Sequence, residues 1–168
     1  IIVDNLAKYY AVDVETGNLI WMKNNIAPFN SQIKIYKNNF LVTDFRNVLR
    51  CYSIKDGKEI WSVKTDTSFI KSQKKLSLII SDEKVYFNNT IGDISAVDID
   101  NGKLIWQTPT QDSSIYESSF QLKTSDLIVA NKSILFSNNK NEFYSLDSET
   151  GTLIWQKKIN STTRPSVV

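Results

Sequence analysis

The sequence predicts an all-β protein, a β-propeller of about four blades with four antiparallel strands in each blade. Three observations lead to this fold class. An eleven-residue pattern occurs four times, at a spacing that is typical of propeller blades or helical solenoids. Short apolar runs, separated by Asn, Asp, Ser or Lys-Asn turns, fill the intervals between the copies. No apolar stripe with helical spacing persists beyond one turn, which decides in favour of strands.

The repeated pattern is a β-hairpin that ends in a tryptophan. Its copies are AVDVETGNLIW, CYSIKDGKEIW, AVDIDNGKLIW and SLDSETGTLIW, and their tryptophans are Trp21, Trp61, Trp106 and Trp155, at intervals of 40, 45 and 49 residues. A glycine stands four residues before each tryptophan, at Gly17, Gly57, Gly102 and Gly151. We expect positive φ at these glycines, since a side chain would clash in a tight hairpin turn or its bulge. The aspartates at the third position are expected to accept hydrogen bonds from the turn, and they are Asp13, Asp98 and Asp147.

The tryptophans are expected to fasten neighbouring blades together. Each one lies on the outermost strand of its blade, and in a propeller the next blade packs against that face. We therefore expect all four rings to be buried between blades. Replacing Trp106 by alanine should cost about 3–5 kcal/mol, because the ring loses its burial and a cavity remains.

The repeat makes residues 1–168 one propeller segment. The approximate blades are 1–25 (partial), 26–66, 67–110 and 111–160, and 161–168 starts the next blade. The chain opens in what we interpret as the second strand of a blade, and Arg164 to Val168 is interpreted as the first strand of another. Because four blades are few for a ring, we expect an open arc, part of a larger seven- or eight-bladed ring, or two chains that complete one ring.

Composition narrows the classes of function. The net charge of +2 and the dispersed basic residues do not indicate a nucleic-acid or membrane-surface partner. The chain has no histidine, the commonest general base and metal ligand, and it shows no phosphate-binding loop, nucleophile elbow or metal-binding cluster. The single cysteine, Cys51, is expected to be a small buried packing residue. No apolar run reaches the roughly 18 residues of a membrane helix.

The pattern Ala-x-Asp-x-x-x-Gly-x-x-x-Trp resembles the tryptophan-docking motif of pyrroloquinoline-quinone-type β-propellers. In that family each blade carries one copy, and the ring stacks on the turn of a neighbouring copy. Residues 11–21 and 96–106 fit the pattern fully. The departures from it are Cys51, Ser53 and Ser145. Enzymes of the family hold the quinone and a calcium ion on the propeller axis, and many use two adjacent cysteines. Since Cys51 is alone, we expect no cofactor, no metal ion and no catalytic residue in this chain.

Within this family the chain is similar to the BamB group, lipoproteins of the machinery that assembles β-barrel proteins in the bacterial outer membrane. The stretches that resemble successive blades of these proteins are IAPFNSQIKIYKNNFLVTDFRNVLRCYSIKDGKEIW and SDLIVANKSILFSNNKNEFYSLDSETGTLIWQKKI. The resemblance implies a non-enzymatic scaffold for protein–protein interactions. It also implies a location at the periplasmic face of the outer membrane, with a lipid anchor outside this chain.

The resemblance further implies a partner and the residues that contact it. BamB-like proteins contact the periplasmic domains of the assembly subunit BamA through loops between blades. The best matching positions here are Ile70, Lys71 and Asp126, while Thr124 stands where an aspartate is typical. Two other functions stay open at this point. The shared motif favours a fragment of a pyrroloquinoline-quinone-dependent alcohol or sugar dehydrogenase, and a ligand-binding or sensor propeller is the third alternative.

Overall fold

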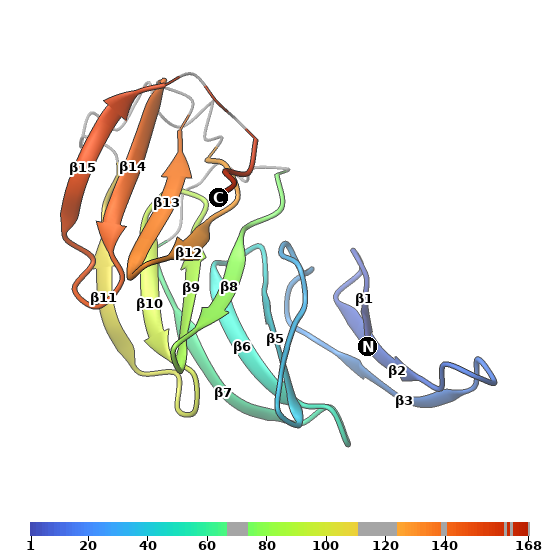
Figure 1. The fold of residues 1–168 in the computed structure, drawn as a ribbon. Helices are drawn as coiled ribbons and strands as arrows, with labels where there is room; N and C mark the ends of the chain where they lie inside the picture. Colours follow the sequence, from blue (N-terminus) through green and yellow to red (C-terminus); the bar gives the residue numbers. More distant parts are fainter. Residues whose placement is uncertain (67–73, 111–123, 139–140, 160, 162, 168) are drawn as a thin grey trace.

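The computed structural model describes residues 1–66, 74–110, 124–138, 141–159, 161 and 163–167. Every regular element in this part of the chain is a β-strand, and the strands form four antiparallel sheets (Figure 1). Each sheet is one blade of a β-propeller, which confirms the predicted fold class. We number the blades 1 to 4 along the chain.

Each blade is a meander in which consecutive strands are neighbours. Blade 1 contains β1 (Ile2–Val3), β2 (Lys8–Val12) and β3 (Leu19–Asn24). Blade 2 contains β4 (Lys34–Tyr36), β5 (Asn39–Thr43), β6 (Val48–Ser53) and β7 (Glu59–Lys64). Blade 3 contains β8 (Leu78–Ser81), β9 (Lys84–Asn88), β10 (Ile94–Asp98) and β11 (Leu104–Thr108). Blade 4 contains β12 (Ile128–Ala130), β13 (Ser133–Ser137), β14 (Glu142–Asp147) and β15 (Leu153–Lys158).

The strand expected at 164–168 does not form in the described residues of that segment. Residues 164–167 belong to none of the four sheets. A strand is defined by hydrogen bonds to a neighbouring strand, and no strand among the described residues pairs with this segment.

The blades stand side by side with their first strands toward one another (Figure 1). β4 contacts β8, and β8 contacts β12, whereas β7, β11 and β15 form the far edges of their sheets. The N–H of Leu76 donates to the carbonyl of Asn30 at 2.7 Å, and the N–H of Leu127 donates to Ser77 Oγ at 2.9 Å. Hydrogen bonds therefore join adjacent blades along their inner side.

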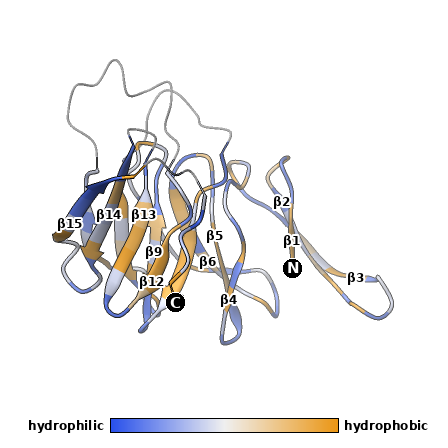
Figure 2. Cartoon of the chain, turned by 45° about the horizontal axis from the view of Figure 1, so that its top comes forward, coloured by the Kyte–Doolittle hydropathy of each residue, from blue (hydrophilic) through white to orange (hydrophobic). Residues whose placement is uncertain are grey.

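Apolar side chains fill the spaces between the blades, and Figure 2 shows hydrophobic residues on the inner strands and hydrophilic ones on β15. Between blades 1 and 2 lie Tyr9, Phe29, Phe40, Val42 and Tyr52. Between blades 2 and 3 lie Leu41, Leu49, Trp61, Val85, Phe87 and Val97. Between blades 3 and 4 lie Tyr86, Ile94, Leu127, Phe136 and Leu146. Because successive residues of a strand point to opposite faces, a single strand such as β9 serves two interfaces.

The four hairpins of the repeated pattern share one backbone geometry. The strand register shifts directly after the first position of the pattern, at Ala11, Cys51, Ala96 and Ser145. The glycines at the seventh position have φ between 66° and 72°, so the expected positive φ is confirmed. The aspartates at the third position accept backbone N–H groups of the turn as expected, and they are Asp13, Asp98 and Asp147.

Three of the tryptophans reach the hairpin of the following blade. Their indole N–H groups donate to the carbonyl at the fourth position of the next copy: Trp21 to Ile54 at 3.0 Å, Trp61 to Ile99 at 3.1 Å and Trp106 to Ser148 at 3.1 Å. Each ring also covers the glycine of that hairpin. A Cβ at Gly57 would lie 2.8 Å from Trp21, and a Cβ at Gly151 would lie 2.5 Å from Trp106. Glycine is therefore required both for its φ and for the close approach of the ring.

The four tryptophans differ in burial. Trp61 is 9% exposed, and Trp21 and Trp106 are half-buried. Trp155 is 38% exposed, so the expectation of burial between blades is wrong for this ring. Its nearest aromatic neighbour is Phe143 of the same sheet, with centroids 5.6 Å apart. The physical reason is that no hairpin of the repeated pattern follows blade 4 in the described residues to cover the ring.

Cys51 is a buried packing residue, as expected. It is 1% exposed and lies opposite Trp61 in the sheet of blade 2. Burial raises the pKa of the Cys51 thiol to about 12, so the thiol stays protonated at neutral pH. Because the thiolate is the nucleophilic form, Cys51 is built for packing rather than for chemistry.

We predict that Trp61→Ala lowers the free energy of unfolding by about 3–5 kcal/mol, because it removes a buried ring and opens a cavity between blades 2 and 3. The matched control is Ile60→Ala on the same strand, since Ile60 is 49% exposed and should cost about 1 kcal/mol or less. Urea unfolding followed by circular dichroism measures both. Equal losses for the two variants would contradict this account of the interface.

Candidate partner-binding face

The two ends of the blades present different structures. The hairpins of the repeated pattern lie at one end. The other end, which we call the linker face, carries the turn before the second-to-last strand of each blade and the segments that connect consecutive blades (Figure 1). The described parts of these connecting segments are 25–33, 65–66, 74–77, 109–110 and 124–127. Loops held on a rigid scaffold are the common place for binding residues, so the linker face is the candidate site.

The linker face carries a second repeat, which the sequence analysis missed. Turns of similar hydrogen bonding begin at Asp4, Asp44, Asn89 and Asn138. Each of these residues precedes the tryptophan of its blade by 17 positions, so they recur at the same intervals of 40, 45 and 49 residues. An Asp or Asn at a fixed distance before each tryptophan was the signal that could have revealed the turn. The variation in repeat length therefore falls between each tryptophan and the next turn.

The first residue of each turn closes it with both its backbone and its side chain. The N–H of Asp44 donates to the carbonyl of Val48 at 3.1 Å, and Asp44 Oδ1 accepts the N–H of Arg46 at 2.8 Å. In blade 3, the Oδ1 atom of Asn89 accepts three backbone N–H groups, those of Ile91, Gly92 and Asp93. Asp and Asn suit this position because their short side chains reach backbone groups a few residues ahead.

The turns also hold the starts of the connecting segments. The fourth residue of each turn has positive φ, and these residues are Ala7, Asn47, Gly92 and Asn141. In every blade the carbonyl of this residue accepts a hydrogen bond from the chain that leaves the last strand. The donors are Asn25, Thr65, Thr110 and Ile159. The start of each connecting segment is thus fixed to its own blade.

The side chain of Asn47 joins two blades at the linker face. Its Nδ2 donates to Thr90 Oγ1 at 2.8 Å and to the carbonyl of Asp66 at 2.7 Å, while its Oδ1 accepts the N–H of Thr90 at 3.2 Å. Asn47 and Thr90 are both buried, and buried polar groups are tolerated when they are hydrogen-bonded in this way. These bonds tie the turns of blades 2 and 3 to the segment that connects them.

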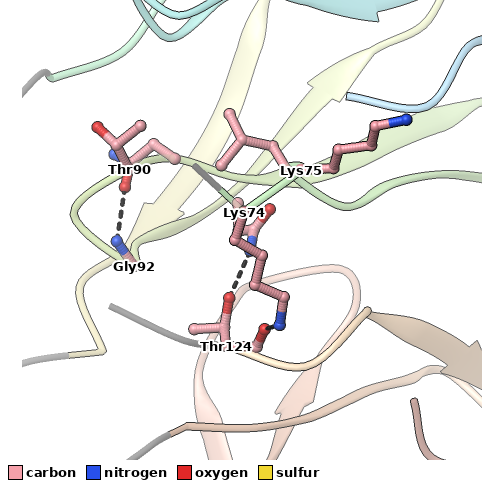
Figure 3. A pocket seen from close by; sticks show the side chains of 8 residues that line it. Lys74, Lys75, Thr90, Gly92 and Thr124 are labelled. Carbon is pink, nitrogen blue, oxygen red and sulfur yellow. Dashed lines mark hydrogen bonds between the residues drawn. The ribbon is translucent and has the colours of Figure 1, made fainter. Parts of the chain in front are cut away.

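A small depression opens on the linker face beside the segments that enter blades 3 and 4 (Figure 3). It is lined by Lys74, Lys75, Leu76, Asn88, Asn89, Thr90, Gly92 and Thr124. The Lys74 ammonium donates to the carbonyl of Thr124, and Asn88 Nδ2 donates to Thr124 Oγ1 at 2.5 Å. Figure 3 shows Lys74 directed toward Thr124, whereas Lys75 points away from it. Lysine, asparagine and threonine side chains make up most of this lining.

The structure places one of the three predicted partner-binding residues. Asp126 lies half-buried in the segment before β12, two residues after Thr124. Its carbonyl accepts the hydroxyl of Ser125 at 3.1 Å. Ile70 and Lys71 lie outside the described residues. Thr124, the departure from the family pattern, is buried and lines the depression.

Two acidic side chains are buried beneath the linker face. Asp44 is fully buried, and its Oδ2 accepts a hydrogen bond from Arg50 Nε at 3.2 Å. Asp93 is 8% exposed, and its Oδ2 accepts bonds from Gln107 at 2.9 Å and Asn89 at 3.3 Å. Burial raises the pKa of the Asp93 carboxyl, because the charged form loses hydration. These acids serve the turns, and the described residues contain no group of three or more potential metal ligands.

We predict that Asp93 makes the stability fall as the pH rises above about 4. Its pKa is higher in the folded chain than the value of about 3.9 expected for an unfolded chain, so over that window the folded state keeps a proton that the unfolded state has lost. The free energy of unfolding then decreases with pH and levels off above the folded pKa. Asp93→Asn should lack this decrease. Urea unfolding between about pH 3.5 and 7 tests it, and identical pH profiles for the two chains would refute it.

No helix among the described residues is long and apolar enough to cross a membrane.

No curated protein matches the sequence significantly. Similar solved structures include three relatives. BamB from Moraxella catarrhalis is 17% identical with a TM-score of 0.73, over 98% of this chain and 51% of that chain. The computationally designed Ika8 protein is 11% identical with a TM-score of 0.69, over 95% and 46%. Quinohemoprotein alcohol dehydrogenase from Comamonas testosteroni is 16% identical with a TM-score of 0.66, over 94% and 33%.

At identities this low, the likeness to these structures establishes the fold alone. The chain spans about half the length of the M. catarrhalis BamB and of the designed protein, and about a third of the length of the dehydrogenase. The family evidence comes from the sequence. A family described as "Outer membrane protein assembly factor BamB" matches residues 1–168, the whole of the chain. The chain therefore belongs to the BamB family of PQQ-like β-propellers.

Proposed function

We propose that this chain is a non-enzymatic scaffold for protein–protein contacts in the assembly of outer-membrane β-barrel proteins, and that it acts through the linker face. The observation that carries the proposal is the turn repeat, which fixes the start of every connecting segment to its blade. A surface that is already ordered loses less conformational entropy when a partner binds. Membership of the BamB family supports the assignment to this machinery.

The proposed partner is the set of periplasmic domains of BamA, and the proposed location is the periplasmic face of the outer membrane. The linker face carries charges of both signs, with Arg46, Asp66 and Lys75 exposed and Asp126 half-buried, and Lys75 lines the depression. Charges at the rim of an interface set orientation and association rate more than affinity. In the proposed contact, Ile70 is the apolar anchor, and Lys71 and Asp126 orient it.

We predict that Ile70→Asp combined with Asp126→Arg abolishes capture of purified BamA periplasmic domains from the same source. Lys75→Glu, at the depression, should weaken capture at least about tenfold if it removes one well-placed charge contact. The matched control is Lys55→Glu, because Lys55 is exposed in the blade 2 hairpin at the opposite end of the blade. Capture is measured by surface plasmon resonance, with circular dichroism to verify the fold of each variant.

The control variant should bind as the parent chain does. If the parent binds and the folded double variant binds equally well, the linker face is not the interface and this proposal fails. Equal weakening by Lys75→Glu and Lys55→Glu would also contradict it, because it would indicate an effect of net charge alone.

A quinone-dependent dehydrogenase is the second candidate function, favoured by the fold likeness to a quinohemoprotein alcohol dehydrogenase. The scaffold proposal predicts no saturable binding when pyrroloquinoline quinone and calcium are titrated together into the purified chain. The reason is the lack of a metal-ligand cluster among the described residues and the protonated state of Cys51. Quinone fluorescence measures the binding. Saturation at micromolar quinone would replace the scaffold proposal with the dehydrogenase.

A further inference from the structure

The hairpin of blade 3 contains an Asn-Gly pair, Asn101-Gly102, in its turn. It is the one Asn-Gly pair in the sequence, and the residues before the glycine in the other hairpins are Thr16, Asp56 and Thr150. In such a pair the backbone nitrogen of glycine can attack the side-chain amide carbon of asparagine, because glycine has no Cβ to hinder the approach. The turn of blade 3 is therefore a candidate site of spontaneous deamidation.

One contact in this turn favours the reaction. Asn101 is exposed, and its Oδ1 accepts the N–H of Lys103 at 2.8 Å. Attack on the side-chain carbon places negative charge on this oxygen, and a donor that is already directed at such an oxygen stabilises the charge. The Asn101 side chain is thus both accessible to water and polarised for attack.

The attacking nitrogen, in contrast, is protected. The N–H of Gly102 donates to the carbonyl of Asp98 at 2.9 Å, and ring closure must break this bond because it replaces the hydrogen by the side-chain carbon of Asn101. Gly102 is also buried beneath the ring of Trp61, which a Cβ at Gly102 would overlap. The indole N–H of Trp61 donates to the carbonyl of Ile99 at 3.1 Å. The docked ring therefore holds the turn against the rearrangement that the reaction needs.

We propose that Asn101 is a deamidation site controlled by Trp61, protected while the ring covers Gly102 and reactive when blades 2 and 3 separate there. The Gly102 nitrogen loses its proton to hydroxide and attacks Asn101 Cγ, ammonia leaves, and a succinimide forms. Water then opens the succinimide at either carbonyl, which gives aspartate or isoaspartate. Overall, the side-chain amide and one water become a carboxylate and one ammonium ion, so the reaction needs no oxidant and no cofactor.

The product opposes a return of the ring. Isoaspartate continues the backbone through its side-chain carbon, so the turn gains an extra main-chain atom between the Asp98 carbonyl and the Gly102 N–H, whose hydrogen bond depends on the length of the turn. Either product also adds a negative charge beside Asp98 and Asp100, and Asp100 already pairs with Lys37 at 3.3 Å. Deamidation thus records an opening of the contact between blades 2 and 3 and weakens that contact afterwards.

The hairpin of blade 2 provides an internal comparison. Asp56 precedes Gly57, which the ring of Trp21 covers in the same way. The N–H of Lys58 lowers the pKa of the Asp56 carboxyl, so this group is ionised at neutral pH. A carboxylate resists attack by a nucleophile, whereas the neutral amide of Asn101 does not. We therefore expect the reaction at Asn101 and not at Asp56.

The first test measures how fast Asn101 deamidates in the folded chain at neutral pH. Trypsin releases residues 85–103, and mass spectrometry with fragmentation assigns the mass gain to a residue. Trp61→Ala should react at least about tenfold faster than the parent, since a tenfold change in the population of an open contact corresponds to about 1.4 kcal/mol. The matched control is Trp106→Ala, which leaves Gly102 covered and should react at the parental rate. Equal rates for the parent and Trp61→Ala, or equal acceleration by both variants, would overturn the proposal.

A second comparison serves if Trp61→Ala does not fold. Trp61→Leu keeps an apolar side chain between the blades, but it has no ring to cover Gly102 and no donor for Ile99. The parent is incubated both folded and in denaturing guanidinium chloride. The folded parent should react at least about tenfold more slowly than the denatured parent and than folded Trp61→Leu. A folded parent that reacts as fast as either of them would refute protection by the docked ring.

The deamidated chain, separated by ion-exchange chromatography, tests the effect on the contact. Hydrogen exchange of the Trp61 indole N–H should be faster in this chain than in the parent, whereas that of the Trp106 N–H should be unchanged. Unchanged exchange at Trp61 would show that the ring docks on the product and would contradict the weakening. Asn101 lies in the blade 3 hairpin, at the opposite end of the blade from the linker face, so these outcomes are independent of partner capture.

Discussion

The contact of an indole ring with the glycine turn of the next hairpin is the constraint on which the rest of this structure depends. It combines a buried or half-buried ring, a hydrogen bond of 3.0–3.1 Å from the indole N–H, and a glycine whose missing Cβ makes room for the ring. A ring placed this way fixes the distance and the rotation between two sheets at their outer edge, while backbone hydrogen bonds such as Leu76 to Asn30 join them at the inner edge. Apolar residues then fill a space whose width is already set.

The number of residues from the linker-face turn to the tryptophan is constant, whereas the length of the segments between blades varies, and both facts have the same structural cause. The tryptophan must stay 17 positions after the first residue of the turn, because the turn and the hairpin close opposite ends of the same strands. These first residues are Asp4, Asp44, Asn89 and Asn138. The connecting segments carry no such restriction. They change length from blade to blade, and they emerge on the linker face, where the carbonyls of Asn47 and of the corresponding residues in the other turns accept hydrogen bonds that hold their starts. A rigid frame with variable connections is the arrangement expected of a protein that presents contact surfaces.

The sequence was sufficient to predict the fold because its signals are local and repeated. Gly57 and Asp98 indicate a turn because the local backbone of the turn requires a positive φ and a side-chain acceptor, and both predictions are confirmed. Burial of Trp155 could not be predicted in the same way, since burial depends on the neighbour that covers a ring and not on the ring's own hairpin. The turn repeat was missed because its first position is Asp in blades 1 and 2 and Asn in blades 3 and 4, so it has no invariant residue. Of the candidate contact residues, Asp126 lies on the linker face. Binding depends on the partner's surface as well as on this one, so it could not be predicted from the sequence of this chain alone.

The indole contact is observed most directly by hydrogen exchange of the four tryptophan side-chain N–H groups, followed by nuclear magnetic resonance of the purified chain. The account predicts slow exchange for Trp21, Trp61 and Trp106, whose N–H groups are bonded to Ile54, Ile99 and Ser148, and fast exchange for Trp155. Fast exchange of all four N–H groups in a chain that keeps its β-sheet spectrum would contradict the claim that these contacts hold the blades together.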